Sequence, residues 1–300
     1  MWNAAGPRGT GKKSREQGMT TIGVIGMGAM GSGVARRIVE GGGRVVTDVA
    51  GRTAATIARA EEAGAETVSA ADLVEQSEII LSVIPPSSAP DVAASYFDLL
   101  GEASNKPIFI DFNAIAPQTL HAIAEPYLAA GLQFGDGSIL GAPPVTGRPG
   151  PRLYMSGPVA GAGKVLRGLG FDIRVLSDGL GDASGLKMAY AGINKGMIAL
   201  ASAIAIGAAR SGALESLVAE LKESQPALYD RFRGALPRMY PKAYRWDGEM
   251  LEIAKFLEPE TGAATMFQGA SQLYEHIAEA EREGADSEIM AILDRFTGRR

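Results

Sequence analysis

Short apolar runs alternate with amphipathic segments through the first half of the chain. Segments 21–25, 44–49, 78–84, 107–111 and 132–136 are each short and rich in Ile, Val, Leu and Phe. Runs of this length and composition predict buried strands, and the segments between them, clearest at 53–63 and 117–130, have helical spacing. Strands that alternate with helices are typical of a parallel, doubly wound sheet.

The pattern changes in the second half. Two short segments, 152–155 and 173–175, predict strands that close the sheet. Small and apolar residues from about 181 to 212 then predict one long helix. After it only helical patterns follow, at 216–223, 226–236, 246–257, 263–283 and 286–296. The sequence therefore predicts an α/β fold followed by an all-helical domain.

Three glycines follow the first predicted strand in the spacing Gly-x-Gly-x-x-Gly. Gly26 permits a tight turn, Gly28 allows backbone to approach a pyrophosphate, and Gly31 allows the following helix to pack closely. The free N–H groups of that helix terminus attract phosphate. Strand, glycine turn and helix together predict a dinucleotide-binding Rossmann domain over 19–177, with an all-helical substrate-binding and dimerisation domain over 178–300.

The choice of cofactor depends on the end of the second strand. Asp48 lies near the distance at which an acid binds a ribose 2′-hydroxyl, whereas Arg52 and Thr53 could hold a 2′-phosphate. We expect NADP, with NAD as the alternative. The predicted cofactor contacts are Gly26, Met27, Gly28, Ala29, Met30, Gly31, Arg52, Thr53 and, at the end of a later strand, Val83, Ile84 and Pro85.

Composition limits the chemistry of the remaining residues. The chain has no cysteine and only two histidines, so thiolate nucleophiles, disulfides and histidine-rich metal sites are excluded, and no metal is expected. A net charge of −5 argues against a nucleic-acid partner. Residues 1–18 are polar and basic without an apolar segment, so we expect a disordered extension and a cytoplasmic protein.

The long apolar helix has two interpretations, and the sequence favours the first. Lys195 interrupts its apolar run and Arg210 closes it, which indicates a buried helix and not a membrane span. Its small residues allow close packing, and its apolar surface exceeds what one domain seam needs. We therefore predict a homodimer and no membrane association.

Lys187, at the start of this helix, is the catalytic candidate. A lysine partly buried among small and apolar residues has a pKa lowered towards the range useful for proton transfer. Ala191 and Asn194 lie within about 40° of it on the same helical face, and Tyr190 lies about 60° to the other side. The alternative is a lysine that covers a domain seam with its aliphatic stem.

Four segments in this order resemble the β-hydroxyacid dehydrogenase family, which includes 3-hydroxyisobutyrate and 6-phosphogluconate dehydrogenases. They are Gly26–Gly31, Asp111–Pro117, Asp136–Ala142 and the stretch from Gly181 to Lys187. The resemblance implies that Lys187 gives or takes the proton at the substrate oxygen while nicotinamide carries the hydride. It also implies a small hydroxy acid or semialdehyde, and hence an anionic substrate.

Several positions depart from the family pattern. Ala191 stands where the family has an asparagine, Asn113 and Ala114 replace a serine and a threonine, and Leu140 replaces a serine. We therefore expect an altered substrate pocket, in a branch similar to less characterised phosphogluconate-dehydrogenase-like proteins. The predicted substrate contacts are Asn113, Ala114, Leu140, Gly141, Ala142, Tyr190 and Asn194.

Two alternatives to a hydroxy-acid dehydrogenase stay open on the sequence. Imine reductases share the architecture but usually lack the lysine. A catalytically silent, NADP-binding regulatory protein would explain Ala191 and Leu140. A cluster at 242–246, with Lys242, Arg245 and Trp246, precedes a helix and either closes over the site or forms a surface hinge.

Overall fold

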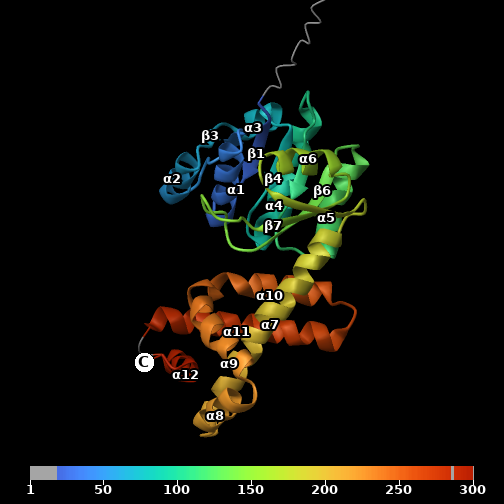
Figure 1. Ribbon diagram of the computed structural model, residues 1–300. Coiled ribbons are helices and arrows are strands. Elements are labelled where there is room, and N and C mark those ends of the chain that lie inside the picture. The colour runs from blue at the N-terminus through green and yellow to red at the C-terminus, as the bar shows by residue number, and fades with distance from the viewer. Residues whose placement is uncertain (1–18, 285–286, 300) are drawn as a thin grey trace, which may run out of the picture.

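Residues 19–284 and 287–299 are described by the computed structural model, which places a sheet domain and a helical domain at opposite parts of one long helix (Figure 1). The extension predicted at 1–18 and the predicted start of the last helix at 286 lie outside the described residues. The sheet domain is drawn in blue to green, and the long helix α7 (Asp182–Arg210) leads from it in yellow.

The sheet has eight strands in the order β3-β2-β1-β4-β5-β6-β7-β8. All neighbouring pairs are parallel except β6 and β7. The strands are β1 (Thr21–Ile25), β2 (Arg44–Thr47), β3 (Glu66–Thr67), β4 (Ile79–Ser82), β5 (Ile108–Asp111), β6 (Phe134–Leu140), β7 (Arg152–Ser156) and β8 (Asp172–Ser177). The predicted doubly wound sheet is thus confirmed.

Helices cover both faces of the sheet, which explains the continuous apolar strands. Side chains of α1, α2 and α6 pack in one core cluster, and those of α3, α4 and α5 in another on the opposite face. Their bounds are α1 (Ala29–Glu40), α2 (Ala54–Glu62), α3 (Ala70–Gln76), η1 (Pro86–Ser88), α4 (Ala89–Glu102), α5 (Pro117–Ala129) and α6 (Ala160–Gly168). We did not predict α3, α4, α6 or β3, because their short or small-residue patterns give little helical or strand signal.

Strand β7 runs antiparallel to β6, which makes the sheet mostly parallel. Segment 141–151 joins β6 to β7 without a helix, so the chain reverses and returns beside the strand it has just left. This segment also packs on α1, where a Cβ on Gly33 would lie 2.9 Å from Pro144 Cδ. Pro144, just after the predicted substrate loop, therefore packs against the first helix.

Six further helical elements build the second domain around α7. They are α8 (Leu214–Ser224), α9 (Pro226–Met239), η2 (Tyr240–Arg245), α10 (Trp246–Phe256), α11 (Thr261–Glu283) and α12 (Glu288–Thr297). Their apolar side chains form a separate core with α7, in which Met188, Leu236, Met250, Tyr274 and Leu293 are fully buried. The predicted helical domain is confirmed, and four residues separate Ser177 at the end of β8 from Asp182 at the start of α7.

A buried carboxylate on β6 anchors the N-terminus of α7. Asp136 is fully buried, and its Oδ2 accepts hydrogen bonds from the backbone N–H groups of Gly181, Ala183 and Ser184 at 2.9–3.0 Å. Ser156 and Ser184 donate their hydroxyls to the same carboxylate. A carboxylate that satisfies the unpaired N–H groups of a helix start also complements the positive helix terminus.

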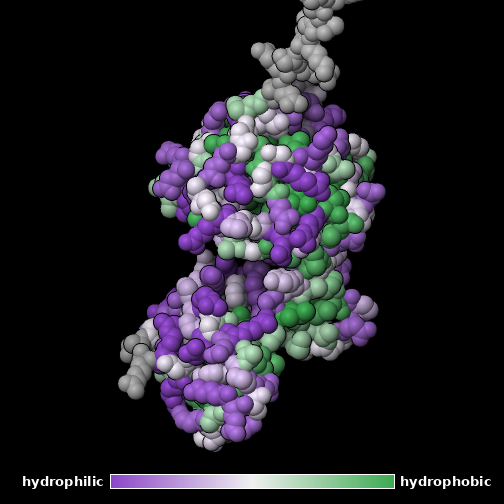
Figure 2. Space-filling model, viewed as in Figure 1, coloured by the Kyte–Doolittle hydropathy of each residue, from purple (hydrophilic) through white to green (hydrophobic). Residues whose placement is uncertain are grey.

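The side of α7 that does not pack against the helical core is largely exposed. Tyr190, Ile193, Leu200 and Ile204 recur at helical spacing and are each more than half exposed. Figure 2 shows apolar surface between the two domains, where Figure 1 draws the upper part of α7. The helix is long and apolar enough to cross a membrane by length and composition, and 39% of its most apolar window is buried within the protein.

Replacing Asp136 by Ala should lower the free energy of unfolding by about 3–5 kcal/mol, because several buried donors lose their acceptor together. Urea denaturation followed by circular dichroism measures the change. The matched control is Asp172→Ala on β8, whose carboxylate is 52% exposed and forms only surface ion pairs, so the loss should stay below about 1 kcal/mol. Equal losses in both variants would contradict the anchoring role.

Candidate functional site

The glycine turn between β1 and α1 has the geometry that a pyrophosphate needs. Gly26 has φ +94°, and a Cβ on it would lie 2.4 Å from the Val83 carbonyl oxygen, so only glycine fits. A Cβ on Gly31 would lie 1.8 Å from the Gly26 carbonyl oxygen. At Gly28, the N-cap of α1, a Cβ would meet no described atom within 4 Å. The turn is therefore tightly packed from behind and open in front.

The same turn presents backbone donors to that open side. Gly28 has no side chain that could accept a hydrogen bond from the first N–H groups of α1. The first turn of α1 also carries no acidic residue. The first N–H groups of a helix lack intrahelical partners and bind anions well. Met27, in contrast, buries its side chain in the core, so a contact with cofactor would involve its backbone. These residues fit a dinucleotide pyrophosphate.

The loop after β2 places the two candidate selectors of the cofactor side by side. Asp48 accepts a hydrogen bond from the Ala50 N–H at 2.8 Å, while Arg52 is exposed and Thr53 caps α2 through the Thr56 N–H. Arg59 of α2 reaches back to the Met27 carbonyl oxygen at 2.8 Å. Sequence reasoning did not identify Arg59, because an arginine on a helix carries no signal of a distant loop contact.

Asn113 joins the ends of β4 and β5 and does not point into open space. Its Oδ1 accepts from the Ile84 N–H at 2.7 Å, and its Nδ2 donates to Asp111 Oδ2 and to Ser82 Oγ. The residue is 2% exposed. This corrects the prediction that Asn113 contacts substrate: its amide is fully occupied in holding the loop that carries Ile84 beside the glycine turn.

Burial also changes the acid behind that loop. Asp111 is buried, and desolvation raises its pKa to about 7, although hydrogen bonds from Asn113 oppose the rise and the neighbouring charge of Asp136 adds to it. Ala114, which follows Asn113 in the loop after β5, is half-buried against the core of the helical domain. The β5 loop therefore links the two domains and does not offer the hydroxyls that the family has there.

Lys187 points from the first turns of α7 to the end of β6. Its Nζ donates to the Ile139 carbonyl oxygen at 2.8 Å, next to the predicted substrate loop formed by Leu140, Gly141 and Ala142. Burial lowers the pKa of Lys187 from its ordinary value of 10.5; the charge of Glu249 opposes this and that of Arg245 adds to it. The fold thus brings the candidate lysine and the candidate substrate loop together.

The other predicted residues of α7 do not join this group in the structure. Asn194 donates to the Tyr190 carbonyl oxygen and accepts from Arg231 Nη2 of α9, each at 2.8 Å. Tyr190 is 54% exposed and lies on the open apolar side of the helix. The prediction that Asn194 shares the cleft of Lys187 is corrected, because both ends of its amide are bound elsewhere; a substrate contact by Tyr190 stays a prediction.

The glycine turn and Lys187 lie along one edge of the sheet. Strands β1, β4, β5 and β6 are consecutive neighbours and parallel, so their carboxyl ends share an edge. Three strand spacings amount to about 14 Å. A dinucleotide that lies across the carboxyl ends, as in other doubly wound sheets, extends in the direction of Lys187.

A second buried charge group lies further along α7. Lys195 and Glu249 form an ion pair, with side chains only 15% and 14% exposed. The Lys195 ammonium also lies 4.7 Å from the centre of the Trp246 ring. In sequence the only signal for Lys195 was a charge inside an apolar run.

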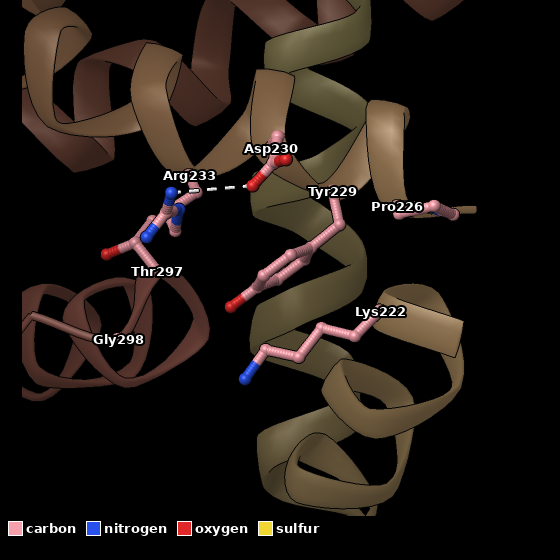
Figure 3. Close-up of a pocket in the computed structure, with 7 residues that line it drawn as sticks. All are labelled: Lys222, Pro226, Tyr229, Asp230, Arg233, Thr297 and Gly298. Atoms are coloured by element: carbon pink, nitrogen blue, oxygen red, sulfur yellow. Dashed lines mark ion pairs between the residues drawn. The ribbon is translucent and has the colours of Figure 1, made fainter. Parts of the chain in front are cut away.

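Surface cavities are found away from these residues. One of about 480 Å³ lies between α8, α9 and the end of α12, lined by Lys222, Tyr229 and Arg233 among others (Figure 3). Arg233 pairs with Asp230 there, and none of the predicted site residues lines it. Within residues 19–284 and 287–299, no three acidic or histidine side chains converge as metal ligands.

Comparison with known proteins matches two separate parts of the chain to known domain families. Residues 21–160 match the family described as NAD binding domain of 6-phosphogluconate dehydrogenase, and residues 208–277 match a domain family of unknown function, DUF1932. The fold and the glycine turn thus define an NAD-binding domain followed by a helical domain. This arrangement is similar to that of 3-hydroxyisobutyrate dehydrogenase-like proteins with a helical C-terminal domain.

Individual relatives show how far the similarity extends. The chain is 28% identical over 86% of its length to an uncharacterized 28.5 kDa protein of Methanothermus fervidus, of which it covers 99%. It is 32% identical to 3-hydroxyisobutyrate dehydrogenase of Pseudomonas aeruginosa, but over only 41% of each chain. The similarity to a characterised dehydrogenase thus spans less than half of either protein.

Solved structures reproduce the whole fold. A conserved protein of unknown function, described as similar to 3-hydroxyacid dehydrogenases, is 26% identical, with a TM-score of 0.65 over 88% of this chain and 99% of its own. An imine reductase of Myxococcus stipitatus in complex with NADP⁺ is 22% identical, with a TM-score of 0.53 over 92% of this chain and 99% of its own. The second similarity concerns the fold alone.

Proposed function

We propose that this protein is an NAD(P)-dependent dehydrogenase or reductase that interconverts a small, anionic hydroxy compound and its aldehyde or ketone. The observation that supports this most is the position of Lys187: its Nζ lies at the end of β6, on the sheet edge that also carries the glycine turn. A proton-transfer group and a dinucleotide site on one edge are what a hydride-transfer enzyme requires.

In this proposal, cofactor binding and proton transfer are assigned to different residues of the chain. The glycine turn and the start of α1 bind the pyrophosphate, and Val83 to Pro85 flank the cofactor. The bound nicotinamide supplies or accepts the hydride. Lys187, with a lowered pKa, takes the hydroxyl proton of the substrate during oxidation and returns it to the oxygen during reduction. The Ile139 carbonyl holds the lysine at the substrate loop.

Reduction of C=N bonds is the second candidate function. The similarity to imine reductases supports it at the level of the fold, whereas the presence of Lys187, a residue that imine reductases usually lack, favours the hydroxy compound. A screen of NADH and NADPH oxidation against semialdehydes, keto acids and imines separates the two. A catalytically silent regulatory protein would bind cofactor and turn over none of them.

Replacing Lys187 by Ala should lower kcat by about 10²–10⁴-fold, the usual contribution of a general acid or base, and leave cofactor affinity unchanged. In the native protein, oxidation should rise with pH through the lowered pKa of Lys187, because the base must be neutral, and reduction should fall over the same range. Steady-state kinetics and calorimetry measure both; exposed Lys164→Ala is the control. Undiminished turnover in Lys187→Ala would remove the lysine from the mechanism.

We further propose NADP as the preferred cofactor, on the basis of Arg52 beside the start of α2. Arg52→Ala should then weaken NADP binding by about 10–100-fold, since a charge-assisted hydrogen bond contributes roughly 1.5–3 kcal/mol, and change NAD binding less than twofold. Calorimetric titration with both cofactors measures this, with exposed Arg148→Ala as the control. Equal weakening for NADP and NAD would contradict the assignment.

We also propose a homodimer formed through the open side of α7. Tyr190, Ile193, Leu200 and Ile204 make a continuous apolar stripe more than half exposed, and surfaces of this kind mark interfaces. A self-complementary stripe on a straight helix suits a two-fold interface.

The double substitution Ile193→Asp and Leu200→Asp should convert a dimer to a monomer, because charges would be buried in the apolar contact. Light scattering coupled to size-exclusion chromatography gives the mass. Leu128→Asp, at a leucine of similar exposure on α5, is the control and should leave the mass unchanged. A native protein that is monomeric, or a double variant that stays dimeric, would disprove this interface.

A further inference from the structure

The proposed function uses one lysine of α7 and leaves a second one unexplained. Lys195 follows Lys187 by two helical turns, about 12 Å along the helix axis. Its side chain is only 15% exposed, although buried lysines are rare unless they have a specific partner. A charged group held in the helical domain on the same helix as the proposed general base needs a physical reason.

Two neighbours contact the Lys195 ammonium group, and a third supports the backbone and the aromatic ring beside it. Glu249 of α10 forms an ion pair with it, and Trp246 lies over it at 4.7 Å from the ring centre. Tyr274 of α11 donates its hydroxyl to the Lys195 carbonyl oxygen at 2.6 Å and packs edge-on against Trp246 at 5.2 Å. The position of this cation is therefore set before any ligand arrives, which lowers the entropy cost of binding.

The charge around this group is not balanced. The charges that act on Lys195 are those of Glu249, Lys187 and Arg245, so the two half-buried lysines and the exposed Arg245 have one carboxylate among them. An ammonium carries three donors, of which Glu249 accepts one. A partly buried surplus of positive charge is costly without an anion, although the chain as a whole carries a net charge of −5. The surplus indicates that an anion belongs at this site.

The loops near Lys187 supply little to bind such an anion. Asn113 is fully occupied within the fold, and Ala114, Leu140 and Ala191 have no polar side-chain atom. If the proposed function holds, the acid group of the substrate must find its partner elsewhere. Lys195 is the first cation on α7 beyond Ala191, and its side chain is only 15% exposed.

We propose that Lys195, positioned by Glu249 and Trp246, binds the acid group of the substrate and so determines its specificity. Because Lys195 is eight residues beyond Lys187 on α7, we expect an acid group that is not attached directly to the reacting carbon. The substrates that fit are chain-end hydroxy acids or semialdehydes with a remote carboxylate or phosphate. Acids in which the two groups are adjacent fit poorly. This inference rests on the proposed function.

Lys195→Met tests the assignment with three aldehydes of defined charge: succinate semialdehyde, 3-oxopropyl phosphate and the neutral methyl ester of succinate semialdehyde. KM for the charged aldehyde that the site accepts should rise at least tenfold, with kcat changed less than threefold and KM for the ester less than twofold. Lys195→Arg should recover part of the loss. Exposed Lys164→Met, on α6, is the control. The two charged aldehydes distinguish a carboxylate from a phosphate site.

A binding measurement keeps the test independent of turnover. Calorimetry should show that succinate binds the native protein saturated with oxidised cofactor at least tenfold more tightly than it binds Lys195→Met; inorganic phosphate is titrated in parallel. Because Lys195→Met leaves Glu249 buried without its partner, the double variant Lys195→Met/Glu249→Gln is measured as well. Thermal melts establish that each variant is folded.

The possible results separate the two proposals. Equal increases in KM for the ester and the charged aldehydes, or a fall in kcat at constant KM, would overturn the role of Lys195. A native protein that turns over no aldehyde, keto acid or imine overturns the proposed function. In that case anion binding lost in both Lys195 variants still supports Lys195 as an anion site, and unchanged anion binding overturns it.

Discussion

The hydrogen bonds from the start of α7 to Asp136 are the constraint on which the rest of the structure depends. One fully buried carboxylate on β6 fixes three N–H groups of a 29-residue helix, and that helix carries both lysines of the site. Lys187 is held by the same strand, because its Nζ donates to the carbonyl oxygen of Ile139, three residues beyond Asp136. Strand β6 therefore determines where α7 begins and where the Nζ atom of Lys187 lies.

This arrangement divides the proposed binding functions between two rigid supports. The sheet edge holds the cofactor turn and the loops after β4 and β5, whose side chains bond each other. The helical domain holds Glu249 and Trp246 against Lys195. Glu252 of α10 connects the two supports, because it accepts hydrogen bonds from the Ala116 N–H and the Thr119 hydroxyl of the sheet domain. A small shift of α10 would therefore affect both sites.

The departures from the family pattern acquire a common physical meaning in the structure. At Asn113 the amide is bound to the ends of two strands, and at Ala114 a methyl group packs on the helical core. The amide of Asn113 is thus used within the sheet domain, and at Ala114 a polar group is replaced by an apolar contact with the helical domain. The ion pair of Lys195 and Glu249 is then the buried charge that remains near the proposed site.

The sequence by itself determined the doubly wound sheet, the glycine turn and the long helix with Lys187, because these depend on local spacing: apolar runs, three glycines and small residues in helical order. It could not determine the partners of Asn113, Asn194, Lys195 or Asp136. Helical angles placed Asn194 near Lys187, but the distance along the axis and the presence of Arg231 on α9 decided its contacts. Which charges meet in a buried site depends on residues far apart in the chain, and only the tertiary structure sets those distances.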